Sequence, residues 1–356
     1  MKLLYKIIIA LLFAVVVLSA IGTLYYFNRI NSEYDEGLSY DFSDDAKYHF
    51  SLILKTEDEV YWQDFIQGVY EAAKANNSAV EYNPVFNPDS NSKMVKYIDI
   101  ASKSKVDGVI VNGNNTAEYA SAINVATDEG LNVVLGGIEA ADSSRLSYVG
   151  TNFYEYGINA AKLIKQIDQG DESINLAVIL STQNDSGEDQ SAPTQSDIMM
   201  NGLKSVIDSD NRVNLVSTQY RNSNLLGAED LTRNILTKYD DIDIIFCTNA
   251  KDTIAATRVI IERNLVGDVY IVGTDVTEDI INYIKKGIVF GVLDRNGYEA
   301  GYNSIEILHD NLGNNFQPSY IDIDINIYTN LNIATYKKDW LEDYEHNKKD
   351  VIKKGV

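Results

Sequence analysis

Short apolar runs alternate with amphipathic stretches along residues 48–273 of the chain. The apolar runs have the length of strands, and they fall at residues 48–54, 106–111, 132–136, 176–180, 213–216, 242–246 and 269–273. Between them, apolar residues recur at the i, i+3, i+4, i+7 spacing of a helix that buries one face. One such stretch carries Trp62, Phe65, Ile66 and Val69, and others cover residues 116–129, 155–167, 195–207, 228–238 and 253–263. This alternation predicts parallel sheets that are covered by helices on both faces.

Ahead of this array, residues 7–27 form a long and predominantly apolar run that lysines precede. A helix over this run would span about 30 Å, the thickness of the hydrocarbon core of a bilayer. A cleaved signal peptide is the alternative, but its apolar core is typically about 7–15 residues long. A cut after Ala20 would also place Leu18 where a small residue is expected. Because Ile21 stands where acylation needs a cysteine, a lipid anchor at that position is excluded.

Acidic residues follow the apolar run, and basic residues precede it, so the N-terminus is expected in the cytoplasm and the body outside. We predict a single-pass membrane anchor over residues 1–30 and a polar, acidic linker over residues 31–46. The body is expected to cover residues 47–335, followed by a charged tail over residues 336–356.

The charge and the cysteine count exclude several classes of partner and site. The chain has 52 acidic and 30 basic residues, which gives a formal net charge of −22 and repels the phosphates of nucleic acids. The single cysteine, Cys247, excludes an internal disulfide and a zinc site built from several thiolates. His49, His309 and His346 lie far apart and in no metal-ligand spacing, so no metal site is expected.

The motifs of common α/β enzymes are also missing from the sequence. It contains no GxGxxG dinucleotide fingerprint, no GxxxxGK[ST] phosphate loop and no GxSxG nucleophile elbow. Cys247 ends an apolar strand, so we expect a buried structural thiol rather than a nucleophile. The sequence therefore predicts a binding protein without a cofactor, and not an enzyme.

Aromatic, amide and charged side chains follow the predicted strands, at the edge where open α/β sheets bind ligands. The candidates are Tyr61, Trp62, Asn112, Glu139, Asn222, Asn249, Asp275 and Arg295. Flat rings cover the apolar faces of a sugar, while amides, carboxylates and guanidinium groups bind its hydroxyls. Each residue also has a structural alternative, because Asn and Asp commonly cap helices and Trp62 lies on the apolar stripe of its own helix. Their repeated placement at strand ends favours a sugar site.

Several of these segments resemble motifs of the type I periplasmic binding proteins of the ribose, galactose and xylose class. The matching segments are Tyr61 and Trp62 ahead of Gly68, residues 106–111 (VDGVIV), 149–157 (VGTNFYEYG), 246–249 (FCTN), 271–275 (IVGTD) and 291–301 (GVLDRNGYEAG). The resemblance runs from about residue 47 to residue 332, with the motifs in the family's order. It implies that Asn249 and Asp275 bind the sugar and that Arg295 replaces a binding glutamine at the hinge.

The chain departs from the family pattern at other positions of the implied binding site. Gly137 and Ile138 stand where the family has an Asp-Arg pair, with Glu139 beside them. Asp197 occupies the position of an expected arginine, and Ala250 follows the binding asparagine in place of an aspartate. These changes imply a rearranged polar rim and leave the identity of the sugar open.

The resemblance also implies the architecture and the biological role. Two α/β lobes with doubly wound parallel sheets are expected, joined by a three-strand hinge: lobe one over residues 47–150 and 296–323, lobe two over residues 151–295 and 324–335. A small sugar (a pentose, a hexose or a related polyol) would bind between the lobes and close them. The expected partner is an ABC permease or a membrane sensor histidine kinase. The alternatives are a degenerate fold that serves only as a protein-interaction module and, less favoured, an enzyme on the same fold.

Overall fold

The computed structural model describes residue 6 and residues 46–55, 60–85, 90–112, 116–140, 142–167, 173–181, 193–209, 212–221 and 227–336. Residues 46–356 form one compact unit, and the fold below is the fold of this unit. The predicted anchor except Lys6, the candidate site residue Asn222 and the tail beyond Tyr336 lie outside the described residues. Within the described part, no helix has both the length and the apolar character that crossing a membrane requires.

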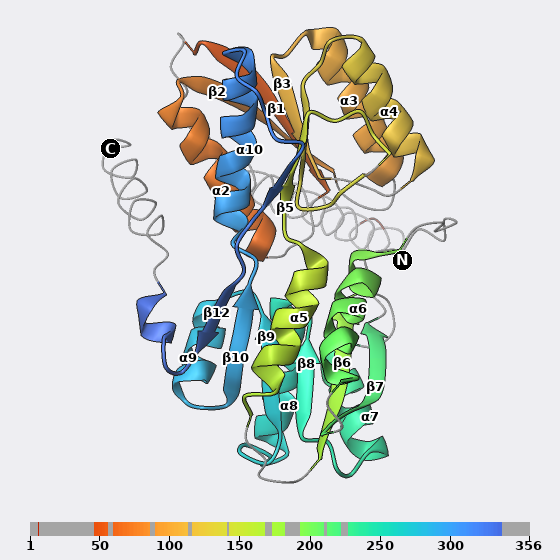
Figure 1. Ribbon diagram of the computed structural model, residues 1–356, viewed down its shortest axis with the longest axis vertical. Helices are drawn as coiled ribbons and strands as arrows, with labels where there is room; N and C mark the ends of the chain where they lie inside the picture. The colour runs from red at the N-terminus through yellow and green to blue at the C-terminus, as the bar shows by residue number, and fades with distance from the viewer. Residues whose placement is uncertain are drawn as a thin grey trace. The chain divides into compact units, whose positions relative to one another are not determined.

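The first six-stranded sheet is formed by five strands from residues 48–150 and one short strand from residues 320–322, and all of its strands are parallel. Its order is β11 (Tyr320–Asp322), β5 (Ser147–Gly150), β4 (Val133–Gly136), β3 (Gly108–Val111), β1 (Tyr48–Lys55) and β2 (Ser78–Val85). The accompanying helices are α2 (Val60–Ala75), α3 (Ser90–Ser104), α4 (Ala117–Asp128) and α10 (Gly297–Leu312). Helices lie on both faces, with α2 and α10 side by side on one of them (Figure 1).

The second six-stranded sheet is parallel except for β12, which runs antiparallel to β10. Its order is β12 (Asn326–Thr329), β10 (Val289–Asp294), β9 (Tyr270–Thr274), β8 (Ile244–Cys247), β6 (Ile174–Ser181) and β7 (Val213–Arg221). Its helices are α5 (Phe153–Ile164), α6 (Gln195–Ile207), α7 (Ala228–Lys238), α8 (Ala250–Glu262), α9 (Glu278–Lys285) and the short 3₁₀ helix η1 (Ile333–Thr335).

The chain passes between the two sheets after β5, after β10 and after β11. The two-lobe α/β architecture expected from the sequence is thereby confirmed. Each predicted strand and helix has a counterpart, whereas β2, β5, β10, β11 and β12 were not among the predicted strands. The edge strand β2 contains Glu81 and Pro84, so its pattern is not the continuous apolar run of a central strand.

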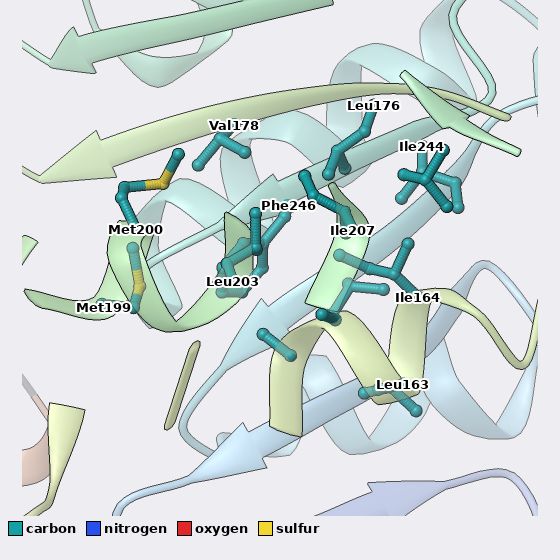
Figure 2. Packing of buried hydrophobic residues seen from close by; sticks show 14 of the residues in the cluster. Leu163, Ile164, Leu176, Val178, Met199, Met200, Leu203, Ile207, Ile244 and Phe246 are labelled. Atoms are coloured by element: carbon teal, nitrogen blue, oxygen red, sulfur yellow. The ribbon is translucent and has the colours of Figure 1, made fainter. Parts of the chain in front are cut away.

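Apolar side chains of the helices pack against the faces of each sheet and form its hydrophobic core. Figure 2 shows the cluster between α5, α6 and the second sheet, where Leu163, Ile164 and Leu203 pack with Phe246. All four side chains are fully buried. Burial of this kind is the main favourable contribution to the stability of such a layer.

Glycines let two helix pairs approach unusually closely. A Cβ atom on Gly301 of α10 would lie 1.9 Å from the backbone oxygen of Phe65 in α2, and one on Gly157 of α5 would lie 1.9 Å from that of Met199 in α6. Because any side chain there would collide with backbone, each of these close helix contacts requires glycine at that position. Helix α10, which begins just after the second crossing, is therefore firmly joined to the helix that carries Tyr61.

Candidate functional site

Asp275 and Arg295 form a buried ion pair at the carboxyl ends of β9 and β10. The two strands are parallel neighbours, with Thr274 opposite Leu293, so the residues that follow them are side by side. The Nε of Arg295 donates to Oδ1 of Asp275 at 3.0 Å, and its Nη2 donates to Oδ2. The side chains are only 12% and 4% exposed, respectively. Such a two-point pair fixes the orientation of both groups.

Tyr61, at the start of α2 in the other lobe, lies against this pair. The Arg295 guanidinium carbon is 4.5 Å from the centre of the Tyr61 ring, which is the geometry of a cation–π contact. Trp62 packs edge-on against Tyr61, with ring centres 5.0 Å apart, and both side chains are buried. The structure thus brings together Tyr61, Asp275 and Arg295 from both lobes, with Trp62 beside them.

Gly137 lies beside the two rings, directly after β4. Its φ is +71°, and a Cβ there would lie 2.7 Å from Cη2 of Trp62. The Gly137 carbonyl accepts hydrogen bonds from the Tyr148 hydroxyl at 3.2 Å and from Nε2 of Gln195 at 3.0 Å. Gln195 belongs to the other lobe, and it was not among the candidates from the sequence. No sequence pattern indicates that its side chain reaches Gly137, which is 58 residues away along the chain.

Asn112 and Asn249 are buried, and the side-chain oxygen of each accepts a hydrogen bond from a backbone N–H. Asn112 accepts from the N–H of Lys55 at 2.9 Å, which ties the ends of β1 and β3 together. Asn249 accepts from the N–H of Asp252 at 2.8 Å and is the N-cap of α8. Both residues lie at strand ends as expected, and both have the structural role that is common for asparagine at such positions.

Asp197 and Glu139 are also engaged within their own lobes. The Oδ2 of Asp197 accepts from the N–H of Thr194 at 2.9 Å, and the Thr194 hydroxyl accepts from the N–H of Asp197 at 3.1 Å. This reciprocal capping box begins α6. Glu139 forms an ion pair with Arg145 in the loop after β4. Within the part of the chain that the structure describes, the side-chain partners of Asp197 and Glu139 are thus Thr194 and Arg145, respectively.

Asp294, the last residue of β10, is a further charged group of this region that the sequence reasoning missed. Burial above all, and then the nearby carboxylates of Asp275 and Asp64, raise the pKa of Asp294 to about 7. The backbone N–H of Asn296 and the charge of Arg295 partly offset these effects. The carboxylates of Asp275 and Asp64, together with the partly ionised Asp294, outweigh the single guanidinium group, so this region carries a net negative charge at neutral pH.

Among the described residues, no group of three or more His, Cys, Asp or Glu side chains is arranged to hold a metal ion. A surface cavity of about 370 Å³ lies elsewhere in the second lobe. Its lining includes Ile242 and Val269, which precede β8 and β9, so it opens at the amino ends of these strands. The polar cluster at the carboxyl ends is therefore the better candidate for a ligand site.

Comparison with known proteins identifies the family. A family model described as a periplasmic binding protein domain matches residues 50–315, well over half of the chain. The chain belongs to the periplasmic binding protein family. The resemblance that the sequence motifs carry is therefore confirmed, and it extends over both lobes.

Individual relatives of this periplasmic binding protein are distant but match along most of their length. The D-allose-binding periplasmic protein of Escherichia coli (strain K12) is 20% identical over 283 residues, covering 77% of this chain and 88% of the relative. A chain of the solved XylFII-LytSN complex is 29% identical, with a TM-score of 0.68 and coverage of 80% and 98%. A solute-binding protein from Actinobacillus succinogenes 130z with bound D-allose shares the fold at 21% identity, with a TM-score of 0.71 and coverage of 82% and 100%.

Proposed function

We propose that this chain is an extracytoplasmic solute-binding protein that binds a small sugar between its two lobes. The observation that carries the proposal is the cluster of Tyr61, Arg295 and Asp275, which joins the two lobes at the carboxyl ends of their strands. Its composition fits a sugar, because rings cover C–H faces while a carboxylate and a guanidinium group bind hydroxyls. The relation to a D-allose-binding protein supports the same class of ligand.

The proposed binding step is a closure of the lobes around the sugar. Asp275 would accept hydrogen bonds from sugar hydroxyls while Arg295 holds its carboxylate in place. Tyr61 and Trp62 would line the apolar side of the ligand. Because the ligand then contacts both lobes in the closed state, its differential affinity for that state determines how far the equilibrium shifts.

Calorimetry and thermal shift on the full chain in detergent test this proposal. D-allose, D-xylose, D-ribose, L-arabinose, D-glucose and D-galactose form the panel. A sugar at 100 times its dissociation constant should stabilise the protein by about 2.7 kcal/mol, which is a readily measured shift. No response to any sugar of the panel would refute sugar binding and leave the protein-interaction module as the better hypothesis.

A pair of matched variants tests the assignment of the site. The Asp275→Asn substitution removes the charged acceptor and should weaken a responding sugar at least about ten-fold, since hydrogen bonds to charged groups contribute about 1.5–3 kcal/mol. Asp243→Asn is the control: Asp243 accepts the backbone N–H of Asn175 at 2.7 Å, at the amino end of the same sheet. Equal affinities of the two variants would remove Asp275 from the site.

We further propose that residues 1–30 anchor the protein in the membrane and that a membrane protein reads the closed state. The XylFII-LytSN complex, in which a chain 29% identical to this one is found with a second protein, favours a signalling partner such as a sensor histidine kinase. An ABC permease is the alternative. Co-purification from native membranes, with the sugar present and absent, distinguishes the two partners by which one is retained.

A further inference from the structure

One hydrogen bond crosses directly from lobe to lobe beside the proposed sugar site. Gln195 is the first residue of α6 in the second lobe, and its Nε2 donates at 3.0 Å to the carbonyl oxygen of Gly137 in the first lobe. The acceptor belongs to the loop after β4, where the family motif has a charged pair and this chain has glycine. The contact is therefore built from a backbone atom and one side chain.

The acceptor side of this bond is rigidly held. The N–H of Gly137 donates to the carbonyl of Val149 at 2.9 Å, and the Tyr148 hydroxyl donates to the same oxygen that Gln195 uses. Trp62 packs so closely on Gly137 that no side chain fits there. Because these contacts fix the peptide plane, the carbonyl oxygen keeps its direction toward the second lobe.

The donor side is held as well. The capping box between Thr194 and Asp197 fixes the first turn of α6, in which Gln195 is the first residue. A Cβ on Gly202 would lie 2.0 Å from the backbone oxygen of Tyr154, so α6 packs directly against the backbone of α5. A hydrogen bond between two fixed ends forms in one relative position of the lobes and breaks when they separate.

We infer that Gln195 is a closure latch, whose hydrogen bond to Gly137 favours the closed arrangement of the lobes before any sugar binds. The effect of this hydrogen bond on sugar affinity rests on the proposed function, because it requires that a sugar binds between the closed lobes. Its effect on lobe closure does not. A neutral hydrogen bond contributes about 1 kcal/mol net, which corresponds to an about five-fold change in the ratio of closed to open molecules. Where the closed form is the minor one, sugar affinity changes by the same factor.

The experiment measures the distance between the lobes without sugar. Spin labels on Lys96→Cys in α3 and Lys204→Cys in α6 report it by pulsed electron resonance in the full chain; both positions are exposed, and the native Cys247 is buried. Gln195→Ala should lower the ratio of closed to open molecules about five-fold. Gln317→Ala is the matched control, because Gln317 donates at 3.3 Å to the carbonyl of Asn315 within its own exposed loop.

The same distance distribution for Gln195→Ala and Gln317→Ala would overturn the latch. Gln195→Glu is the second variant, since a carboxylate cannot donate to a carbonyl, and it should open the lobes at least as far. If D-allose or another panel sugar binds more weakly to Gln195→Ala while the sugar-free distance is unchanged, Gln195 is a ligand contact and the latch is wrong. If the wild type binds no sugar but Gln195→Ala opens, the latch holds and the proposed sugar binding fails.

Discussion

The Asp294→Asn substitution should change how the stability of the protein depends on pH. In the folded protein the pKa of Asp294 is about 7, against an ordinary value of 3.8. The groups that face it are Asp275 after β9, Asp64 of α2, the adjacent Arg295, the N–H of Asn296, Tyr328 of β12 and Tyr336 after η1. Of these, burial and the two carboxylates disfavour the charged form, whereas Arg295 and the N–H favour it.

The sign of the effect follows from which state holds the proton. Between pH values of about 4 and 7 the unfolded chain has lost the Asp294 proton while the folded protein retains it. The free energy of unfolding therefore falls as pH rises through this window and levels off above it. A difference of about three pKa units at about 1.36 kcal/mol each sets an upper limit of about 4 kcal/mol, which solvent screening at the partly exposed carboxyl reduces.

Urea unfolding of the wild type and of Asp294→Asn from about pH 4.5 to about pH 8 measures this contribution. An amide resembles the protonated carboxyl, so the two proteins should have similar stability at the acidic end. At the alkaline end the variant should be the more stable one, by roughly 1–3 kcal/mol, which is below the unscreened limit. Parallel stability curves over the whole range would show that Asp294 titrates alike in the folded and unfolded states, and the reasoning would be refuted.

Two further substitutions test the ion pair and the helix packing. Arg295→Ala leaves the Asp275 carboxylate buried and without its guanidinium partner, so it should lower the free energy of unfolding by about 3–5 kcal/mol. The double variant Arg295→Ala, Asp275→Asn should lose less stability in urea denaturation than the sum of the two single losses. Strictly additive losses would contradict the coupling of the two residues. Gly301→Ala places a Cβ against the backbone oxygen of Phe65 and should destabilise by at least about 1–3 kcal/mol. Its control is Gly227→Ala, whose added Cβ meets no atom of the described residues within 4 Å, and this variant should stay within about 1 kcal/mol of wild type in the same melts.

The elements that the sequence predicted correctly are those with a strong local pattern. Strand β6 contains the continuous apolar run 176–180, and α6 carries its apolar residues at helical spacing, so neighbours along the chain suffice to recognise both elements. Strands β11 and β12 have three and four residues, and none of them is fully buried. Their strand conformation depends on pairing with β5 and β10, distant in sequence, and no local pattern marks that pairing.

The sequence by itself determined the two-lobe α/β class, the family and the kinds of side chain at the strand ends, because apolar periodicity and short motifs are properties of neighbouring residues. Only the tertiary structure decided how those side chains are used. The side-chain oxygens of Asn112 and Asn249 accept hydrogen bonds from backbone N–H groups, whereas Asp275 and Arg295 form an ion pair next to Tyr61. The hydrogen bond of Gln195 to Gly137 likewise depends on the tertiary structure. The sheet order and the three crossings between the lobes determine which distant segments lie side by side, and therefore which groups can form hydrogen bonds.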